Sequence, residues 1–188
     1  MAMSAPVAAR PLTVDEVIKM SEAGILAEGE RVELRDGLLT RMSPESNDHA
    51  EAVERLTMLL ADRYYRSGYS IRVQITLSID EINYLVPDFV VRGRPLRGWP
   101  APDQVELVVE LARSSVRYDI GQKALDYAAW GAQRYWVVDL ARGEVVVHEN
   151  PIANRYRSIT RIGQDGHLTV PGVGSRLAVR DLVPPWDD

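Results

Sequence analysis

Three runs of almost uninterrupted apolar residues constrain the fold of this chain more than any other feature. They cover residues 84–92 (YLVPDFVVR), 105–111 (VELVVEL) and 134–140 (RYWVVDL). Such runs are typical of strands that are buried on both faces of a sheet. A helical pattern over residues 117–130, ended by Gly131, lies between the second run and the third. Because a strand–helix–strand unit joins parallel strands, the sequence predicts a parallel pair inside a central sheet.

The remaining segments predict further helices and strands around this sheet. Thr13 and Glu16 match a capping box for a helix over residues 13–23. Asp36-Gly37 is typical of a type I′ hairpin turn. The other expected elements are a helix from Asn47 or Asp48 to about Ser67, an alternating strand over residues 69–79, and strands in the tail that begins near Glu144. The fold class is therefore mixed α/β: a central sheet flanked by helices, with an N-terminal hairpin and a β-rich C-terminal part.

Length and composition bound what this chain can be. Its 188 residues fit one domain, and 46% of them are apolar, which is enough for an ordered core. We expect residues 1–12 to form a flexible tail. The chain has no cysteine, which excludes disulfides, thiolate zinc sites and cysteine nucleophiles. It shows neither a signal peptide nor a membrane-spanning run, so we expect no membrane partner and a cytoplasmic location. The net charge of −5 argues against a surface built throughout to bind nucleic acid and leaves room for a local basic cleft.

Two carboxylates interrupt the apolar runs. Asp88 is expected on a strand face with Val86 and Val90, and Glu110 lies between Val109 and Leu111. An ionised carboxylate in an apolar sheet costs several kcal/mol unless it is paired or binds a cation. A shared divalent ion would resolve both the burial and the mutual repulsion, and oxygen ligands favour Mg²⁺ or Mn²⁺. The alternatives are a strand-edge aspartate after Pro87, and a buried ion pair between Glu110 and an arginine such as Arg113.

Lys123 follows on the predicted helix, and it is one of only two lysines in the chain. Asp119, Lys123 and Tyr127 are four residues apart and form one stripe. An ammonium group close to a bound metal ion could stabilise charge that develops on a phosphoryl group. The alternative is that Lys123 pairs with Asp119 or is a solvated helix charge. Two carboxylates, a metal ion and a lysine together indicate phosphodiester hydrolysis.

An ordered series of motifs resembles the Uma-type restriction endonucleases of the PD-(D/E)XK nuclease superfamily. The series is VELRDGLLTRMSP with a later His49, then PDFVV, LVVELARSS, YDIGQKALDYAAWGAQRYWVVD and PGVGSRLAV, over residues 30–180. The resemblance implies a restriction-endonuclease-like fold, Asp88 and Glu110 as metal ligands, and Lys123 as the catalytic lysine. The chain departs from the motif at Ala112, where the superfamily has its lysine, so the resemblance moves that role to the following helix.

Four further positions are weaker candidates. The resemblance suggests that Glu33, in the first hairpin, faces the site as a catalytic residue, although a surface charge explains it almost as well. Gln74 is expected to face away from the apolar side of its strand, where it would hold a water molecule or meet solvent. His49 is more typical of a helix cap than of a ligand, and Tyr127 is as typical of a core. His148 and His167 are expected at the surface.

The leading interpretation is a Mg²⁺-dependent or Mn²⁺-dependent endonuclease that acts on DNA. A second interpretation is a non-catalytic nucleic-acid-binding or assembly module that retains the nuclease fold, because a fold does not fix a function. A third is a structural homodimer that pairs through apolar C-terminal strands. Phosphate-loop NTPases and GxSxG hydrolases are disfavoured, since neither motif occurs in the sequence.

Overall fold

The structure, a computed structural model, describes residues 9–43, 45–93 and 98–183. Its chain separates into two compact units, Met1–Ser43 with Ser78–Leu85 and Pro44–Leu77 with Val86–Asp188. The expected single domain over residues 1–188 stays a prediction. Of the expected flexible tail, residues 1–8 lie outside the described residues. Leu12, at the end of that tail, donates its backbone N–H to the carbonyl oxygen of Gly37 at 3.0 Å.

The first unit contains a helix and short strands. Helix α1 (Val14–Glu22) starts at Thr13 with the predicted capping box, in which the Glu16 side chain and the Thr13 side chain each accept a backbone N–H of the other residue. The predicted hairpin joins β1 (Val32–Arg35) to β2 (Leu38–Arg41). Asp36 and Gly37 have φ of 49° and 71°, as a type I′ turn requires. A four-stranded sheet in the order β2-β1-β5-β4 continues through β5 (Tyr84–Leu85) and β4 (Leu77–Ser78).

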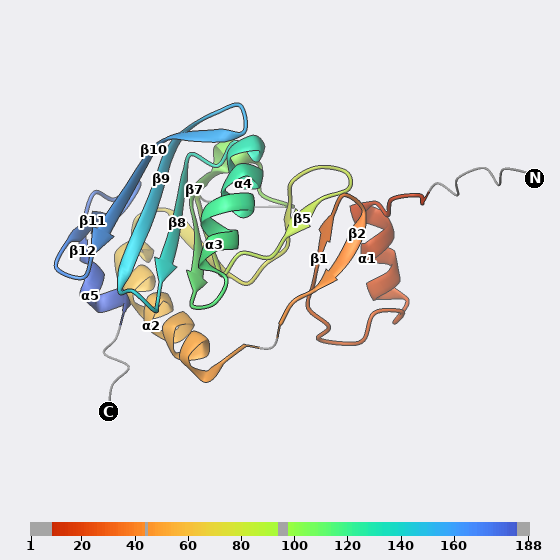
Figure 1. The fold of residues 1–188 in the computed structure, drawn as a ribbon, viewed down its shortest axis with the longest axis horizontal. Coiled ribbons are helices and arrows are strands. Elements are labelled where there is room, and N and C mark those ends of the chain that lie inside the picture. Colours follow the sequence, from red (N-terminus) through yellow and green to blue (C-terminus); the bar gives the residue numbers. More distant parts are fainter. Residues whose placement is uncertain (1–8, 44, 94–97, 184–188) are drawn as a thin grey trace, which may run out of the picture. The chain divides into compact units, whose positions relative to one another are not determined.

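The second unit is built on a six-stranded sheet in the order β10-β9-β8-β7-β6-β3. Strands β7 to β10 are labelled in Figure 1. The predicted parallel pair is confirmed as β7 with β8, and the other neighbours are antiparallel. The strands are β3 (Tyr69–Val73), β6 (Phe89–Gly93), β7 (Val105–Ala112), β8 (Arg134–Asp139), β9 (Glu144–Ile152) and β10 (Arg155–Gly163). The remaining elements are α2 (Asn47–Tyr64), η1 (Pro102–Gln104), α3 (Val116–Tyr118), η2 (Asp119–Lys123), α4 (Ala124–Trp130), β11 (His167–Thr169), β12 (Arg176–Ala178) and α5 (Val179–Leu182).

The two faces of this sheet carry different residues. One face packs on α2 through a core that includes Leu56, Phe89, Val109 and Trp136. Side chains alternate along a strand, so the neighbours of those core residues face the opposite side. Tyr135 is one such neighbour, and its ring lies 4.7 Å from the ring of Tyr127 on α4. Helices α2 and α4 therefore cover opposite faces, and Glu110 faces α4.

Two of the predicted strands are wrong in their extent. The alternating run 69–79 divides into β3 and β4 because Gln74 adopts a φ of 50°, outside the extended region. The apolar run 84–92 divides into β5 and β6, which belong to different sheets. Asp88 therefore comes immediately before a strand and not within one. Helix α2 is capped by Ser46, one residue before Asn47 and two before Asp48, the two expected caps, and it ends at Tyr64, three residues before the expected end at about Ser67.

The predicted helix 117–130 is confirmed in position and differs in detail. A π-helical segment, η2, lies between α3 and α4 and carries both Asp119 and Lys123. Gly131 ends the helix with a φ of 98°, as predicted. A π-helical turn widens the helix by one residue, and such turns occur frequently at functional sites. Among the described residues, no helix is long and apolar enough to cross a membrane.

Candidate metal and phosphate site

Strand register brings Asp88 and Glu110 together at one end of the six-stranded sheet. Phe89 pairs with Val109 in the antiparallel β6–β7 ladder. The next position beyond that pair is Asp88 opposite Glu110. A side-chain hydrogen bond fixes this arrangement, because the backbone N–H of Leu111 donates to Oδ2 of Asp88 at 2.8 Å. Both carboxylates are buried, at 5% and 4% exposure. The sequence-based expectation that neighbouring segments carry these two acids is correct, with Asp88 just outside its strand.

Gln74 follows the last residue of β3, Val73, which pairs with Phe89, so it lies beside Asp88. Its backbone N–H donates to the carbonyl oxygen of Asp88 at 3.0 Å. The left-handed backbone at Gln74 directs the chain away from β6 after this bond. Its side-chain amide donates to the carboxylate of Glu45, in the segment before α2. Gln74 thus contacts the site through both its backbone and its side chain, whereas the sequence left it between holding a water molecule and facing solvent.

Glu110 is held by two donors from the π-helical turn and α4. Lys123 Nζ donates to Oε1 of Glu110 at 2.8 Å, and the hydroxyl of Tyr127 donates to the same oxygen at 2.7 Å. Lys123 and Tyr127 are themselves buried, at 6% and 0% exposure. An ion pair to Arg113 is not how Glu110 is satisfied, because Arg113 pairs with Asp48. Lys123 therefore lies against Glu110, as the sequence predicts, and Tyr127, which the sequence left between this cluster and the core, contacts the same carboxylate.

Asp119 provides Lys123 with a second carboxylate. The Lys123 Nζ lies 3.8 Å from Oδ1 of Asp119, which is four residues earlier, about one helical turn. Asp119 Oδ2 accepts a hydrogen bond from the hydroxyl of Ser115 at 2.5 Å. The ammonium group is therefore held between Glu110 and Asp119. The interpretation of Lys123 as a solvated helix charge is excluded by its burial, while its pairing with Asp119 exists alongside the bond to Glu110.

Burial governs the acid–base behaviour of Glu110. Removal from water raises the pKa of its carboxyl group, Lys123 lowers it, and the charges of Asp88 and Asp119 raise it again, with a result of about 8. A carboxyl group with such a pKa is one whose negative charge is poorly compensated by the protein alone. A cation placed between Asp88 and Glu110 would favour the ionised form of both carboxylates.

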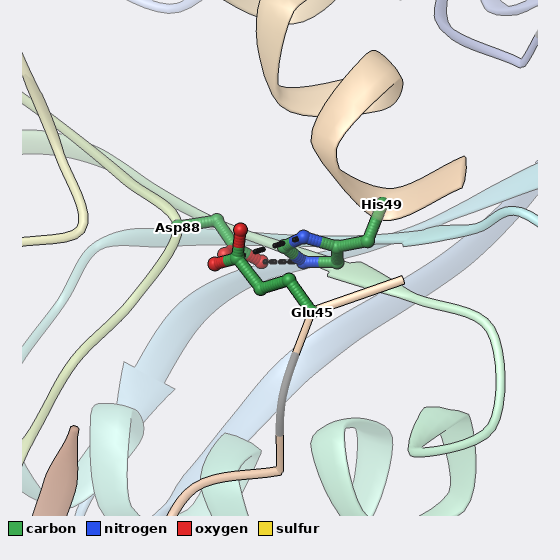
Figure 2. Close-up of side chains that lie close together, drawn as sticks. All are labelled: Glu45, His49 and Asp88. Carbon is green, nitrogen blue, oxygen red and sulfur yellow. Dashed lines mark hydrogen bonds and ion pairs between the residues drawn. The ribbon is translucent and has the colours of Figure 1, made fainter. Parts of the chain in front are cut away.

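Asp88 also contacts a histidine of helix α2. His49 Nε2 lies 3.2 Å from Oδ2 of Asp88, and His49 Nδ1 lies 4.0 Å from Oε1 of Glu45. Figure 2 shows both carboxylates on the side of the imidazole ring that carries its two nitrogens. His49 lies in the first turn of α2, whose N-cap is Ser46. It is therefore a helix-start residue, as the sequence indicates, and it also reaches the candidate site.

The donor atoms of this site fit a hard divalent cation. The hydrogen bonds described above fall on Oδ2 of Asp88 and on Oε1 of Glu110. The second oxygen of each carboxylate is not engaged by those donors, so it can face an ion. Mg²⁺ typically takes one or two protein carboxylates and completes its shell with water and substrate phosphate. Asp88 and Glu110 are the residues that could hold it.

The remaining candidates lie elsewhere or in other roles. Glu33 lies on β1 in the first unit, where it is 5% exposed and 3.6 Å from Nε of Arg35. Its burial excludes a simple surface charge, and its catalytic role stays a prediction. His148, expected at the surface, is 1% exposed and packs against Tyr135 and Tyr156. That expectation is wrong because β9 is covered by α4 on this face.

Glu45 is the site residue that the sequence reasoning missed. It comes before the helix, outside any apolar run, so burial arguments do not single it out. The signal that could have found it is proximity in the chain: Glu45 comes just before the N-cap of α2, four residues ahead of His49, and the two side chains meet at the helix start.

Comparisons with known proteins agree with this architecture. A family model described as "Uma2: Putative restriction endonuclease" matches residues 14–180. The crystal structure of a protein titled as a putative nuclease belonging to DUF820, from Anabaena variabilis ATCC 29413, is similar with a TM-score of 0.73 and 15% identity. That similarity covers 92% of this chain and 97% of the other chain. No curated protein matches the chain. The predicted restriction-endonuclease-like fold is confirmed at this level.

Proposed function

Because this chain belongs to the Uma2 restriction endonuclease family, we propose that it is an endonuclease that hydrolyses DNA phosphodiester bonds with Mg²⁺ or Mn²⁺. The observation that carries the proposal is the buried cluster of Asp88, Glu110 and Lys123 at the end of two neighbouring strands. Ion pairs buried only for stability are often no better than apolar residues of the same size. A functional reason therefore explains this cluster better than a structural one.

Each side chain has a distinct task in this proposal. Asp88 and Glu110 supply the oxygen ligands for the cation, which when bound would offset charge on the scissile phosphate. Lys123 presents an ammonium group whose position is fixed by Glu110 and Asp119, and it would stabilise negative charge on the phosphoryl oxygens. Tyr127 fixes the Glu110 carboxylate from the same helix. Because these donors are held in place before substrate arrives, little reorganisation is needed during the reaction.

Two features bear on the setting of the enzyme. The absence of cysteine supports the cytoplasmic location that is part of the proposal. The side chains of Ile152 and Ile159 are 55% and 59% exposed on β9 and on the edge strand β10. Exposed apolar residues on an edge strand support a homodimer through this strand, which sedimentation of the purified protein would test.

The test is cleavage of supercoiled plasmid DNA by wild-type protein and three variants, Asp88→Asn, Glu110→Gln and Lys123→Met. The matched control is Lys19→Met, which alters the other lysine of the chain, exposed on α1. Wild type and control should cleave in Mg²⁺ or Mn²⁺, and each site variant should lose at least about 100-fold in rate. Cleavage that survives equally in all variants would identify a contaminant. Metal-independent DNA binding without cleavage would favour the non-catalytic module, for which the net charge of −5 is the main difficulty.

A further inference from the structure

The His49 side of Asp88 holds a second group of potential ligands. One ligand atom from each of Glu45, His49 and Asp88 lies within 4.8 Å of the other two. Ligand atoms around a tetrahedral zinc ion at ordinary bond lengths are about 3.4 Å apart. A contraction of at most about 1.4 Å would therefore close the group around an ion. The Glu45 side chain is 30% exposed, so it can make this movement together with the Gln74 amide that donates to it.

Charge and chemistry select the kind of ion. Two carboxylates lie on the nitrogen-bearing side of one imidazole ring, and each faces a different ring nitrogen (Figure 2). A metal ion takes one nitrogen of a histidine. A carboxylate oxygen from each of Glu45 and Asp88 lies near enough to join that nitrogen around one ion. Imidazole ligands favour Zn²⁺ and related transition ions, whereas Mg²⁺ strongly prefers oxygen.

We infer that Glu45, His49 and Asp88 form a binding site for a divalent transition ion of the Zn²⁺ class. This site is distinct from the carboxylate pair proposed for Mg²⁺, and Asp88 belongs to both. The inference deepens the proposed function, on which its catalytic relevance rests. Asp88 would then connect an ion held by α2 on one side with an ion held beside Glu110 on the other.

Further contacts hold the three ligand side chains in place. Asp88 is fixed by the Leu111 N–H, so its Oδ2 is directed before any ion arrives. Glu45 is directed by the side-chain amide of Gln74, and Gln74 is itself tied to the Asp88 carbonyl. His49 is directed by its place in the first turn of α2. Three separate segments of the second unit thus orient the three ligands toward one another.

Calorimetric titration with Zn²⁺ alone, on the full chain, tests this inference. We expect His49→Gln and Glu45→Gln each to weaken Zn²⁺ affinity at least about tenfold, since even groups outside the ligand shell change metal affinity by that amount. The matched controls are His167→Gln, on the exposed surface of β11, and Glu51→Gln, on the exposed face of α2. Both controls should bind Zn²⁺ as wild type does. Wild-type affinity in His49→Gln would overturn the inference.

Imidazole ¹⁵N resonances give an independent reading, because the chain has only three histidines. The His49 signals should shift at one equivalent of Zn²⁺, while those of the buried His148 and the exposed His167 remain in place. Equal shifts at His49 and His167 would show that Zn²⁺ binds exposed histidines without selecting this group.

Glu110→Gln separates this inference from the proposed function. That variant should lose cleavage in Mg²⁺ and keep its Zn²⁺ affinity. Loss of cleavage in Glu110→Gln, combined with unchanged Zn²⁺ affinity in His49→Gln, would refute the second site and leave the endonuclease in place. Zn²⁺ affinity that depends on His49, in a protein that cleaves no DNA, would support the site and refute the endonuclease.

Discussion

Replacing Lys123 with methionine tests how Glu110 is held in the fold. Methionine keeps most of the volume of the buried side chain and removes its ammonium group. Glu110 then loses the 2.8 Å hydrogen bond to Nζ and the group that lowers its pKa. Hydrogen bonds that involve a charged group contribute about 1.5–3 kcal/mol to stability. We therefore expect Lys123→Met to lower the free energy of unfolding by about 2 kcal/mol at pH 7.

The cost should grow with pH, and its sign follows from the raised pKa of Glu110. A carboxyl group with a raised folded-state pKa contributes stability that is fully present below its unfolded pKa, and this stability is lost as pH rises through the folded pKa. In the wild type that loss ends near pH 8. Without Lys123 the folded pKa moves higher, so the loss continues at about 1.4 kcal/mol per pH unit. The destabilisation should be about 1.4 kcal/mol larger at pH 9 than at pH 7.

The assay is urea unfolding at pH 7 and pH 9 in the presence of a chelator, so that no metal ion contributes. Lys19→Met, on exposed α1, is the control and should change stability little at either pH. An equal cost for Lys123→Met at both pH values would refute the reasoning, because Glu110 would then not be the group whose ionisation Lys123 supports.

Three further predictions concern the same part of the fold. Tyr127→Phe should lower the free energy of unfolding by about 1.5–3 kcal/mol at pH 9, and the control Tyr135→Phe by about 0.5–1.5 kcal/mol. The Tyr127 hydroxyl donates to the Glu110 carboxylate, whereas the Tyr135 hydroxyl donates at 3.1 Å to a backbone carbonyl oxygen. A larger loss for Tyr135→Phe in urea unfolding would contradict this prediction. Gly131→Ala should lower the melting temperature, because an L-residue at a φ of 98° costs about 1–2 kcal/mol. Gly121→Ala should raise the melting temperature, because an added Cβ there meets nothing within 4 Å. Melting-temperature shifts of the same sign in both variants would be inconsistent with these conformations. The stability of metal-free protein should fall from pH 5 to pH 8, because Glu110 ionises in the unfolded chain while its raised pKa of about 8 keeps it protonated in the fold. Mg²⁺ should reduce that fall, and stability gains from Mg²⁺ that do not depend on pH would place the ion away from Glu110.

The central sheet could be predicted because strands that are buried on both faces consist largely of apolar residues. Residues 105–111 and 134–140 are apolar at almost every position, and the structure makes them the parallel pair β7 and β8. The site followed from the same logic, since Glu110 is conspicuous only against apolar neighbours. Its bond to Lys123, from the helix between those strands, could also be expected from the crossover that returns this helix to the sheet.

Other features could not be predicted, for identifiable physical reasons. The apolar run 84–92 gives no sign that β5 and β6 join different sheets, because apolar composition records burial and not the identity of the partner. Gln74 interrupts a regular alternation through its backbone angle, and glutamine has no marked preference for that angle. The π-helical turn at Asp119–Lys123 inserts one extra residue into the helix, and its residue types are the same as those of an ordinary α-helix. His148 is buried where α4 packs against β9, and the sequence of β9 alone does not show that this helix covers it.

The central claim is that Asp88 and Glu110 hold one divalent ion together. Calorimetric titration with Mg²⁺, which prefers oxygen ligands, measures this most directly. Asp88→Asn and Glu110→Gln should each weaken Mg²⁺ binding at least about tenfold, while Glu51→Gln, on the exposed face of α2, should bind as wild type does. If Glu110→Gln binds Mg²⁺ with wild-type affinity, the two carboxylates do not share an ion, and the proposed hydrolytic site is contradicted.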